Sequence, residues 1–570
     1  MNAETFCEHF ATFADAPNGV QKLRAMILQL AVQGKLVPQD PNDEPASKLL
    51  GRISADQKRR EAEESARTQK ALPPISADEI LYELPEGWAW ERLGNIGDTN
   101  IGLTYSPQHV GETGVPVLRS SNIQNGRIDL TDLVRVSMDP KSSVLVADGD
   151  LLICARNGSR ALVGKVAMIE HLSEKTAFGA FMAILRSSIN EYLYHFICSP
   201  LFRRVIADTN TTTINQITQS NLRSTLAPIP PLAEQRRIVE KVDQLLGLCD
   251  ELAARQAAQR EKRQRLVGAT LDRLVSTRNP AEFPTHAHRL RNHFDQLFDT
   301  PTTIPQLRQT ILQLAVQGQL VPQDPNDEPV SQLIQRAALA KSGIRESLDV
   351  RGNPAEIGAA PNDAENPLPD GWAWAQIGNI AVIRGGKRLP KGVSFSAVKT
   401  PYVYIRVTDM KDQTVSMHDL QYLDDATHRL LHRYTIDSTD LYVVIVGATI
   451  GKVGRVPEPL SGMHLTENAA RLVFREFDQE FLLLTLRSQS VQSQFVAKTF
   501  QQAQPKLALN RIESTLIPVP PIAEQKRIVT KVTELLSLCD ALEAKLTQAE
   551  SASTQLLSAA VHHLLHNSPS

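Results

Sequence analysis

The chain has 570 residues, of which 42% are hydrophobic and 22% are charged, so it is long enough for several domains with apolar cores. Its formal net charge of −2 argues against a strong free-standing nucleic-acid binder, because neutralising phosphates requires clustered lysine and arginine. The five cysteines are widely spaced without a C-x-x-C pair, which disfavours both a zinc site and a disulfide framework.

The N-terminal part predicts a helical framework. Residues 1–17 lack the basic and apolar regions of a signal peptide, and no later run approaches the ~20 apolar residues of a membrane span, so we expect a cytoplasmic protein without membrane contact. Apolar residues then recur at helical spacing, at Leu23, Ile27, Leu30 and Ala31. Gly34 and the prolines after it predict the end of this helix, and the charged stretch 46–70 predicts a solvated helix.

The stretch 91–227, called insert 1 below, has a different pattern. Short β-branched runs separated by Gly and Asn turns predict strands at Val115–Leu118, Asp150–Cys154 and Val163–Ile169. A single helix is expected over Tyr192–Ala207. Together they predict a mixed α/β domain of about 140 residues, which is an ordinary domain size.

A long helix is predicted after the proline-rich hinge Pro228–Pro231. Apolar residues alternate there at four- and three-residue spacing, at Ile238, Val242, Leu245, Cys249 and Leu252, which is typical of a coiled-coil seam. The helix would run for about 40 residues, on the order of 60 Å. We interpret the quartets 234–237 and 524–527 as helix N-terminal acids, each followed by an exposed basic pair, and not as catalytic carboxylates.

The rest of the chain repeats this order. Residues 23–45 and 307–329 are identical at 20 of 23 positions, at an offset of 284, which also relates LPEGWAW (84–90) to LPDGWAW (368–374). The hinge and helix start at 228–242 match 518–532 at an offset of 290. The second copy therefore gained six net residues between the two blocks.

The two copies differ most in their inserts. Insert 2 (375–517) shares with insert 1 only traces, which pair 118–128 with 404–415 and 160–169 with 447–456. Its predicted strands include Tyr402–Val407 and Leu441–Val446, and a single helix is predicted over Glu480–Lys498. One scaffold carrying two different inserts is expected of a protein that reads two different things with one geometry. A recent duplication with uneven drift is the alternative.

The second seam, from Ile528 to Ala549, matches the first, so the simplest partner of each long helix is the other. We therefore predict an α+β fold with two mixed α/β domains separated by a long antiparallel two-helix coiled coil, related by a pseudo-twofold internal repeat. Residues 330–366, rich in Gly, Asn and Pro, are expected to be a partly loose linker. The predicted segments are a helical framework (1–83), a first domain (84–230), a central helix (231–278), a second framework with linker (279–367), a second domain (368–520) and a C-terminal helix (521–570).

Enzymatic motifs are missing from the sequence. Gly447–Lys452 is too short for a phosphate-binding loop, and Val453 stands where Ser or Thr is required. No G-x-G-x-x-G, H-E-x-x-H or G-x-S-x-G motif is evident. We therefore predict no catalytic, cofactor-binding or metal-binding residues. Two other classes remain open, a coiled-coil adaptor that does not read DNA and a fused enzyme with an unrecognised site.

Three motifs carry a resemblance to a known family. P-[IV]-P-P-[LI]-A-E-Q-[RK]-R-I-V occurs twice, as do L-P-[ED]-G-W-A-W and I-L-Q-L-A-V-Q-G-[KQ]-L-V-P-Q. In these residues, and over essentially its whole length, the chain resembles the specificity subunits of type I restriction-modification systems. The resemblance implies that each insert is a target recognition domain that reads one half of a split double-stranded DNA site. It also implies partners, namely two adenine-methyltransferase subunits and the restriction subunits, which carry S-adenosylmethionine, ATP and Mg.

The residues expected to read DNA lie on polar loops, because base edges are read by Arg, Asn, Gln, Lys and Ser. In insert 1 the candidates are Arg119, Ser120, Ser121, Asn122, Arg156, Asn157, Ser159, Arg160, Thr212, Asn215 and Gln216. In insert 2 they are Arg384, Lys387, Arg388, Lys391, Arg406, Lys452, Gln502, Gln504 and Lys506. Basic and acidic residues nearly balance in each domain, so we expect partner subunits to strengthen binding.

Overall fold

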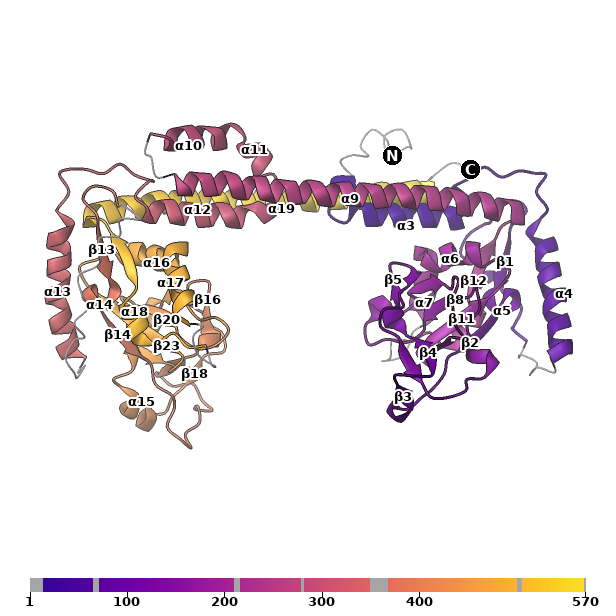
Figure 1. Cartoon of the computed structure of the whole chain (residues 1–570), viewed down its shortest axis with the longest axis horizontal. Helices are drawn as coiled ribbons and strands as arrows, with labels where there is room; N and C mark the ends of the chain where they lie inside the picture. Colours follow the sequence, from indigo (N-terminus) through magenta and orange to yellow (C-terminus); the bar gives the residue numbers. More distant parts are fainter. Residues whose placement is uncertain are drawn as a thin grey trace. The chain divides into compact units, whose positions relative to one another are not determined.

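The computed structural model of the chain describes residues 14–64, 71–209, 216–277, 281–348, 368–499 and 505–567. The chain divides into two compact units (Figure 1). Unit 1 comprises Met1–Arg260 and Ala549–Ser570, and unit 2 comprises Glu261–Gln548. Each unit contains one insert and one copy of the repeated framework.

The first framework helix, α3 (Gly19–Val32), ends as the sequence predicts. Gly34 has a left-handed backbone with φ of 68°, and the N–H of Lys35 bonds to the carbonyl of Leu30 at 2.9 Å. A Cβ on Gly34 would lie 2.5 Å from Cγ of Pro85. The glycine is therefore required both by its backbone angle and by the segment packed against it.

The linker prediction for 330–366 is wrong in its first half. Residues Val330–Ser347 form helix α13, the counterpart of α4 (Ala46–Glu64) in unit 1. Both helices bury apolar residues at the same spacing, namely Ala46, Leu49 and Ile53 in α4 and Val330, Leu333 and Ala337 in α13. The sequence analysis missed this apolar stripe because the residues after it are rich in Gly, Asn and Pro. The rest of the predicted linker, 349–367, lies outside the described residues.

Each insert is built on two four-stranded sheets. In insert 1 the first sheet has the order β2 (Asp98–Ile101), β11 (Met182–Arg186), β8 (Leu151–Cys154) and β9 (Val166–Met168), and the second has β10 (Ala177–Phe178), β4 (Val115–Leu118), β7 (Val134–Val136) and β3 (Val110–Gly111). A hairpin joins β5 (Ile123–Gln124) to β6 (Arg127–Ile128). The predicted strands of insert 1 are thus confirmed, with Val163–Ile169 shortened to β9.

Insert 2 repeats most of this topology. Its first sheet has the order β14 (Ala381–Gly385), β23 (Ala469–Phe474), β20 (Leu441–Val444) and β21 (Val453–Arg455), and its second has β18 (Gln421–Tyr422), β15 (Val403–Ile405), β22 (Met463–Leu465) and β19 (Thr435–Ile436). Insert 2 thus repeats the first sheet and three adjacent strands of the second, but its fourth strand, β19, pairs with β22, the counterpart of β10, whereas β3 of insert 1 pairs with β7. The hairpin of β16 (Met410–Lys411) and β17 (Thr414–Val415) corresponds to β5 and β6. The weak sequence traces therefore reflect one shared fold.

Two helices stand where each insert was predicted to have one. Insert 1 has α6 (Asn190–Cys198) and α7 (Pro200–Thr209), and insert 2 has α16 (Gln479–Arg487) and α17 (Gln489–Thr499). Ser199 and Ser488 break the helices with extended backbones, ψ 156° and 152°, and each hydroxyl bonds to a carbonyl of the preceding turn. In its own unit, α6 contacts α3 and the edge strand β9, as α16 contacts the framework helix α12 (Ile304–Val316) and β21 (Figure 1).

The ends of each insert pair with each other. Strand β1 (Ala89–Arg92) lies antiparallel to β12 (Leu226–Ile229), and β13 (Ala373–Gln376) lies antiparallel to β24 (Leu516–Val519). Each of these strands spans the boundary between an insert and the repeated block beside it, and the two strand pairs form what is called the neck of each domain. The neck of each domain is thus closed at the point where the repeated sequence meets the insert.

The predicted long helices are α9 (Leu232–Ser276, 45 residues) and α19 (Ile522–Asn567, 46 residues). In unit 1, Ile238 and Val242 of α9 share a core with Leu557 of α19 and with α3. In unit 2, Leu271 of α9 shares a core with Ile528 of α19 and with α12. Each unit thus packs the start of one long helix with the end of the other, in antiparallel order. The seam has an additional framework helix as partner, which the sequence prediction omitted.

The remaining helices are short. They are α5 (Leu93–Ile96), α8 (Gln219–Ser224), α10 (Phe283–Asn292), α11 (Phe294–Leu297), α14 (Ile377–Ile380), α15 (Asp425–Leu431) and α18 (Leu509–Glu513), with 3₁₀ turns that include η3 (Ser120–Asn122), η5 (Arg160–Leu162) and η7 (Val407–Asp409). None of the helices in the described ranges is long and apolar enough to cross a membrane.

Candidate nucleic-acid interface

A turn with the same internal bonding follows the equivalent strands β4 and β15. In insert 1, Arg119 contacts Oδ2 of Asp132 at 3.0 Å, and the Asn122 amide donates to the carbonyls of Asp129 and Asp132, each at 3.0 Å. Asn122 is 2% exposed. We therefore reassign Asn122 from base contact to holding the loop, which leaves Ser120 and Ser121 at its surface.

Insert 2 holds its turn with a charge pair. Arg406 bonds to Oδ1 of the buried Asp409 at 2.8 Å and to the carbonyl of Asp419 at 2.7 Å. Hydrogen bonding to Asp409 raises the pKa of Arg406 above its ordinary value. The guanidinium is thus committed to the fold, and we reassign Arg406 to positioning as well.

The fold brings the described candidates of insert 1 together. Asn157 donates to Oγ of Ser120 at 3.3 Å, which joins the turn after β4 to the loop after β8. Arg156 and Gln216 form an antiparallel bridge, which joins that loop to the third cluster. Ser159 and Arg160 are exposed on the same loop. Thr212 and Asn215 lie outside the described residues.

Phe181 belongs to the same surface but was not predicted. It stands in the turn before β11, is 59% exposed, and accepts hydrogen bonds at its carbonyl from the N–H groups of Ala155 and Arg156, at 2.9 and 3.0 Å. The Arg156 guanidinium lies 5.2 Å from the centroid of the Phe181 ring. In the sequence, Phe181 reads as one more apolar residue of a buried strand, so only its exposure reveals it.

The glycine-containing loop of insert 2 lies against the turn before β23. Lys387 donates its N–H to the carbonyl of Leu465 at 2.9 Å, and Arg388 pairs with Glu467 at 2.8 Å. A Cβ on Gly386 would lie 2.1 Å from the carbonyl oxygen of Thr466, so the close approach requires glycine. Arg384 and Lys387 both lie over the Tyr434 ring, at 5.2 and 5.6 Å from its centroid.

A second group of candidates in insert 2 joins the same turn. Val446 forms a bridge with Lys506 and donates its N–H to the carbonyl of Asn468 at 3.2 Å. Lys452 is exposed on the loop after β20, and Lys391 is exposed on the glycine-containing loop. Gln502 and Gln504 lie outside the described residues.

Helix α15 adds a basic segment to insert 2 that the sequence analysis missed. Residues 428–433 read HRLLHR, of which 428–431 lie in α15 and 432–433 directly follow it, and the readable signal was this repeated pair of His and Arg. His428 stacks on Tyr402 with ring centroids 3.8 Å apart and bonds to His464 at 2.9 Å. Burial lowers the pKa of His464 to about 4, so this histidine is neutral at physiological pH.

The repeated blocks around the inserts meet in one buried network. In unit 1, Glu234 is 1% exposed and accepts hydrogen bonds from Nε1 of Trp88 at 2.9 Å and Nε2 of Gln39 at 3.2 Å, while Arg237 pairs with Asp43 at 2.6 Å. Burial raises the pKa of Glu234 above its ordinary value. The predicted exposed basic pair is therefore half wrong, since Arg237 is engaged and only Arg236 is exposed.

Unit 2 repeats the network with one difference. Gln323 donates to Glu524 at 3.2 Å and Arg527 pairs with Asp327 at 2.7 Å. The indole N–H of Trp372 lies near the Glu524 carboxylate without hydrogen-bond alignment. These contacts join the three blocks that are nearly identical in the two copies (23–45, 84–90 and 228–242 in the first copy). The contacts give a physical reason why all three blocks occur together in each copy.

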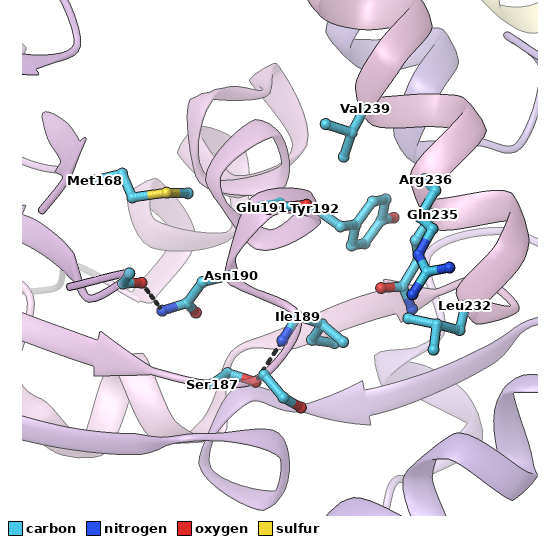
Figure 2. Close-up of a pocket in the computed structure, with 12 residues that line it drawn as sticks. Met168, Ser187, Ile189, Asn190, Glu191, Tyr192, Leu232, Gln235, Arg236 and Val239 are labelled. Atoms are coloured by element: carbon cyan, nitrogen blue, oxygen red, sulfur yellow. Dashed lines mark hydrogen bonds between the residues drawn. The ribbon is translucent and has the colours of Figure 1, made fainter. Parts of the chain in front are cut away.

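A cavity of about 360 Å³ lies in unit 1 between the starts of α6 and α9, and Figure 2 shows its lining. Tyr192 and Gln235 line it beside the exposed Arg236, and Asn190 donates to the carbonyl of Gly149 at 2.7 Å. None of the candidate DNA-reading residues lines this cavity. Among the residues that the structure describes, no group of three metal-binding side chains is placed to hold a metal.

Comparisons with known proteins place these features in a family. The family model "Type I restriction modification DNA specificity domain" matches residues 85–261 and 369–550. The chain is 31% identical over 550 residues to the type I restriction enzyme EcoAI specificity subunit of Escherichia coli, covering 92% of this chain and 90% of that protein. It is 29% identical over 564 residues to the EcoEI specificity subunit of Escherichia coli, covering 95% and 93%. A crystal structure of the HsdS subunit from Thermoanaerobacter tengcongensis covers 86% of this chain and 99% of that one, at 17% identity and a TM-score of 0.38.

Proposed function

The chain belongs to the type I restriction-modification DNA specificity family, and on this premise we propose that its two target recognition domains read the two halves of an asymmetric, bipartite DNA site. The chain is the specificity subunit, a non-catalytic part of a type I restriction-modification enzyme. Insert 1 would read one half-site and insert 2 the other.

One observation carries this proposal: the two inserts share a fold and a closed neck but present different side chains at equivalent loops. The first sheet has the same order in both inserts, the second shares three adjacent strands, and the framework network holds both necks. Base readout depends on the side chains at groove edges, whereas their placement depends on the scaffold. Two different loop surfaces on one scaffold therefore favour two different half-sites.

The partners follow from the proposed role. Two methyltransferase subunits and the restriction subunits would dock on the repeated framework, which occurs once in each unit. S-adenosylmethionine, ATP and Mg would then be bound by those subunits, and the complex would act on DNA in the cytoplasm. We propose that the framework, domain and helix segments divide at 83/84, 230/231, 278/279, 367/368 and 520/521.

The test is a methylation map. The chain is co-produced with a methyltransferase subunit of a type I system from the same host, and adenine methylation is mapped across the host genome by single-molecule sequencing. We expect one motif made of two dissimilar halves separated by unspecified bases. A continuous palindrome, or no motif, contradicts the proposal.

An exchange experiment tests the assignment of one insert to one half-site. Residues 91–227 are replaced by the corresponding insert of a related subunit with a known motif, and the matched control replaces residues 375–517. Each exchange is expected to change one half of the motif and to leave the other intact. A change in both halves from a single exchange contradicts the assignment.

A further inference from the structure

The two inserts share a turn that carries side chains of different chemistry at the same position, an exposed Phe181 in insert 1 and a half-buried Asn468 in insert 2. In insert 1 the turn spans Gly179–Met182, with Met182 N–H bonded to the Gly179 carbonyl at 2.8 Å. In insert 2 it spans Thr466–Ala469, with Ala469 N–H bonded to the Thr466 carbonyl at 3.1 Å. Phe181 and Asn468 occupy the same position, directly before β11 and β23.

The same backbone bonds fix this position in both inserts. The Phe181 carbonyl accepts from the N–H groups of Ala155 and Arg156, at 2.9 and 3.0 Å. The Asn468 carbonyl accepts from the N–H groups of Ile445 and Val446, at 2.8 and 3.2 Å. A carbonyl that accepts two hydrogen bonds restricts the backbone of the turn. The residue at this position is therefore held in the same place in each domain.

The neighbours of this position are also equivalent. Arg156 forms a bridge with Gln216 in insert 1, and Val446 forms the corresponding bridge with Lys506 in insert 2. The N–H of Ile217 bonds to the Ala155 carbonyl at 2.7 Å, and the N–H of Leu507 bonds to the Ile445 carbonyl at 3.0 Å. Each insert thus has three adjacent positions with matched backbones. They are filled by Arg, Phe and Gln in insert 1 and by Val, Asn and Lys in insert 2, where the Val and the Asn are half-buried and the Lys is exposed.

The exposed phenylalanine has a high solvation cost that a binding partner would remove. Phe181 is 59% exposed although it directly precedes a strand with a buried core, and Arg156 covers part of its ring. Apolar side chains read thymine through its methyl group, whereas asparagine reads adenine through N6 and N7. The chemistry at the shared position therefore differs in the way that two different bases require.

We propose that Phe181 and Asn468 are paired specificity-determining residues, with Phe181 contacting the methyl group of a thymine in one half-site and Asn468 the major-groove edge of an adenine in the other. The inference rests on the proposed function of the two inserts. It adds which turn reads DNA and which base class each turn selects.

A uracil scan tests the Phe181 arm. The purified complex with methyltransferase is bound to duplexes carrying its mapped motif, in which each thymine of the first half-site is replaced in turn by uracil. Loss of one buried methyl group is worth ~0.8 kcal/mol, so we expect about fourfold weaker binding at one position. The variant Phe181→Ala should bind more weakly and should not distinguish thymine from uracil there.

The matched control for Phe181 is Leu162→Ala, which removes another exposed apolar side chain, 39% exposed, from the loop after β8 of the same insert. This variant should keep the fourfold effect of uracil. A first half-site without a uracil-sensitive position, or equal sensitivity in Phe181→Ala, overturns the Phe181 arm. Weaker binding of Phe181→Ala to every sequence, without uracil sensitivity in the wild type, would indicate a wedge between base pairs and also overturns it.

A 7-deazaadenine scan tests the Asn468 arm, because this base lacks the N7 acceptor. Wild-type complex should lose affinity at one adenine of the second half-site, and Asn468→Ala should show no further loss there. The variant Phe181→Asn should change the mapped motif only in its first half. If the wild-type complex methylates a bipartite site but neither scan finds a side-chain-dependent position, the inference fails and the proposed function stands. If no bipartite site is methylated, the proposed function itself fails.

Discussion

The buried carboxylate of Glu234 gives a quantitative test of how the framework holds insert 1. It accepts hydrogen bonds from Nε1 of Trp88 at 2.9 Å and from Nε2 of Gln39 at 3.2 Å. Glu234→Ala removes both acceptors. The Trp88 residue is 9% exposed, so its indole N–H cannot reach water, and leaving this buried donor without an acceptor costs about 1–3 kcal/mol of folding free energy. The exposed Gln39 amide can instead bond to water. Relief of the buried charge offsets part of this loss, so we expect a net loss of about 2 kcal/mol.

Two matched variants separate the contributions. Glu234→Gln keeps a carbonyl oxygen for Trp88 and removes the charge, so it should lose about 1 kcal/mol or less. Glu524→Ala should also lose about 1 kcal/mol, because the Trp372 N–H is not aligned with the carboxylate that this variant removes.

The assay must report each unit separately, since a chain of two units need not unfold in one step. Hydrogen–deuterium exchange measured by mass spectrometry gives the free energy of opening for peptides over 84–92 and 368–376. Wild-type protection of 84–92 in Glu234→Ala would refute the reasoning. Equal losses in Glu234→Ala and Glu524→Ala would show that the Trp88 hydrogen bond is not the source.

Three further predictions concern the loops and the neck. Arg406→Ala should destabilise the turn after β15 by about 1–3 kcal/mol, because it leaves the buried Asp409 without its charged partner, and Arg406→Lys should not restore the lost stability. Hydrogen–deuterium exchange of peptides over 403–422 checks both variants. The hydrogen bond from Arg92 holds the pKa of Glu79 at about 2, below its ordinary 4.5. The stabilisation of the folded state by this ion pair is therefore present above pH 4.5 and is lost as the pH falls towards 2. Glu79→Gln should therefore flatten the acid limb of the stability–pH curve, and an unchanged limb would contradict the assignment. Arg156→Ala should weaken binding of the complex to its site by about fivefold to 150-fold, with the lost discrimination confined to the first half-site, as measured by competition with single-base variants.

The sequence by itself determined the architecture in outline. The duplication, the closing blocks, both long helices and the insert strands were all readable, because periodicity and near-identity are local properties of the chain. The helix end at Gly34 was readable for the same reason, since a glycine followed by prolines is a local signal. The prediction failed at α13, whose apolar stripe was masked by its Gly- and Pro-containing continuation.

Only the tertiary structure decided which of the candidate polar residues are exposed and which are held by hydrogen bonds within the fold. In the sequence, Asn122 and Arg406 looked like residues that read DNA, but in the structure both hydrogen-bond within their own loops. The sequence did not show this, because the partners lie up to 13 residues away and approach only when the loop folds. Phe181 looked like core and is exposed, because a turn carries it outward just before its strand begins. Burial and hydrogen-bond partners depend on contacts between segments distant in sequence, and those contacts separate the residues that hold a loop from the residues that the loop presents.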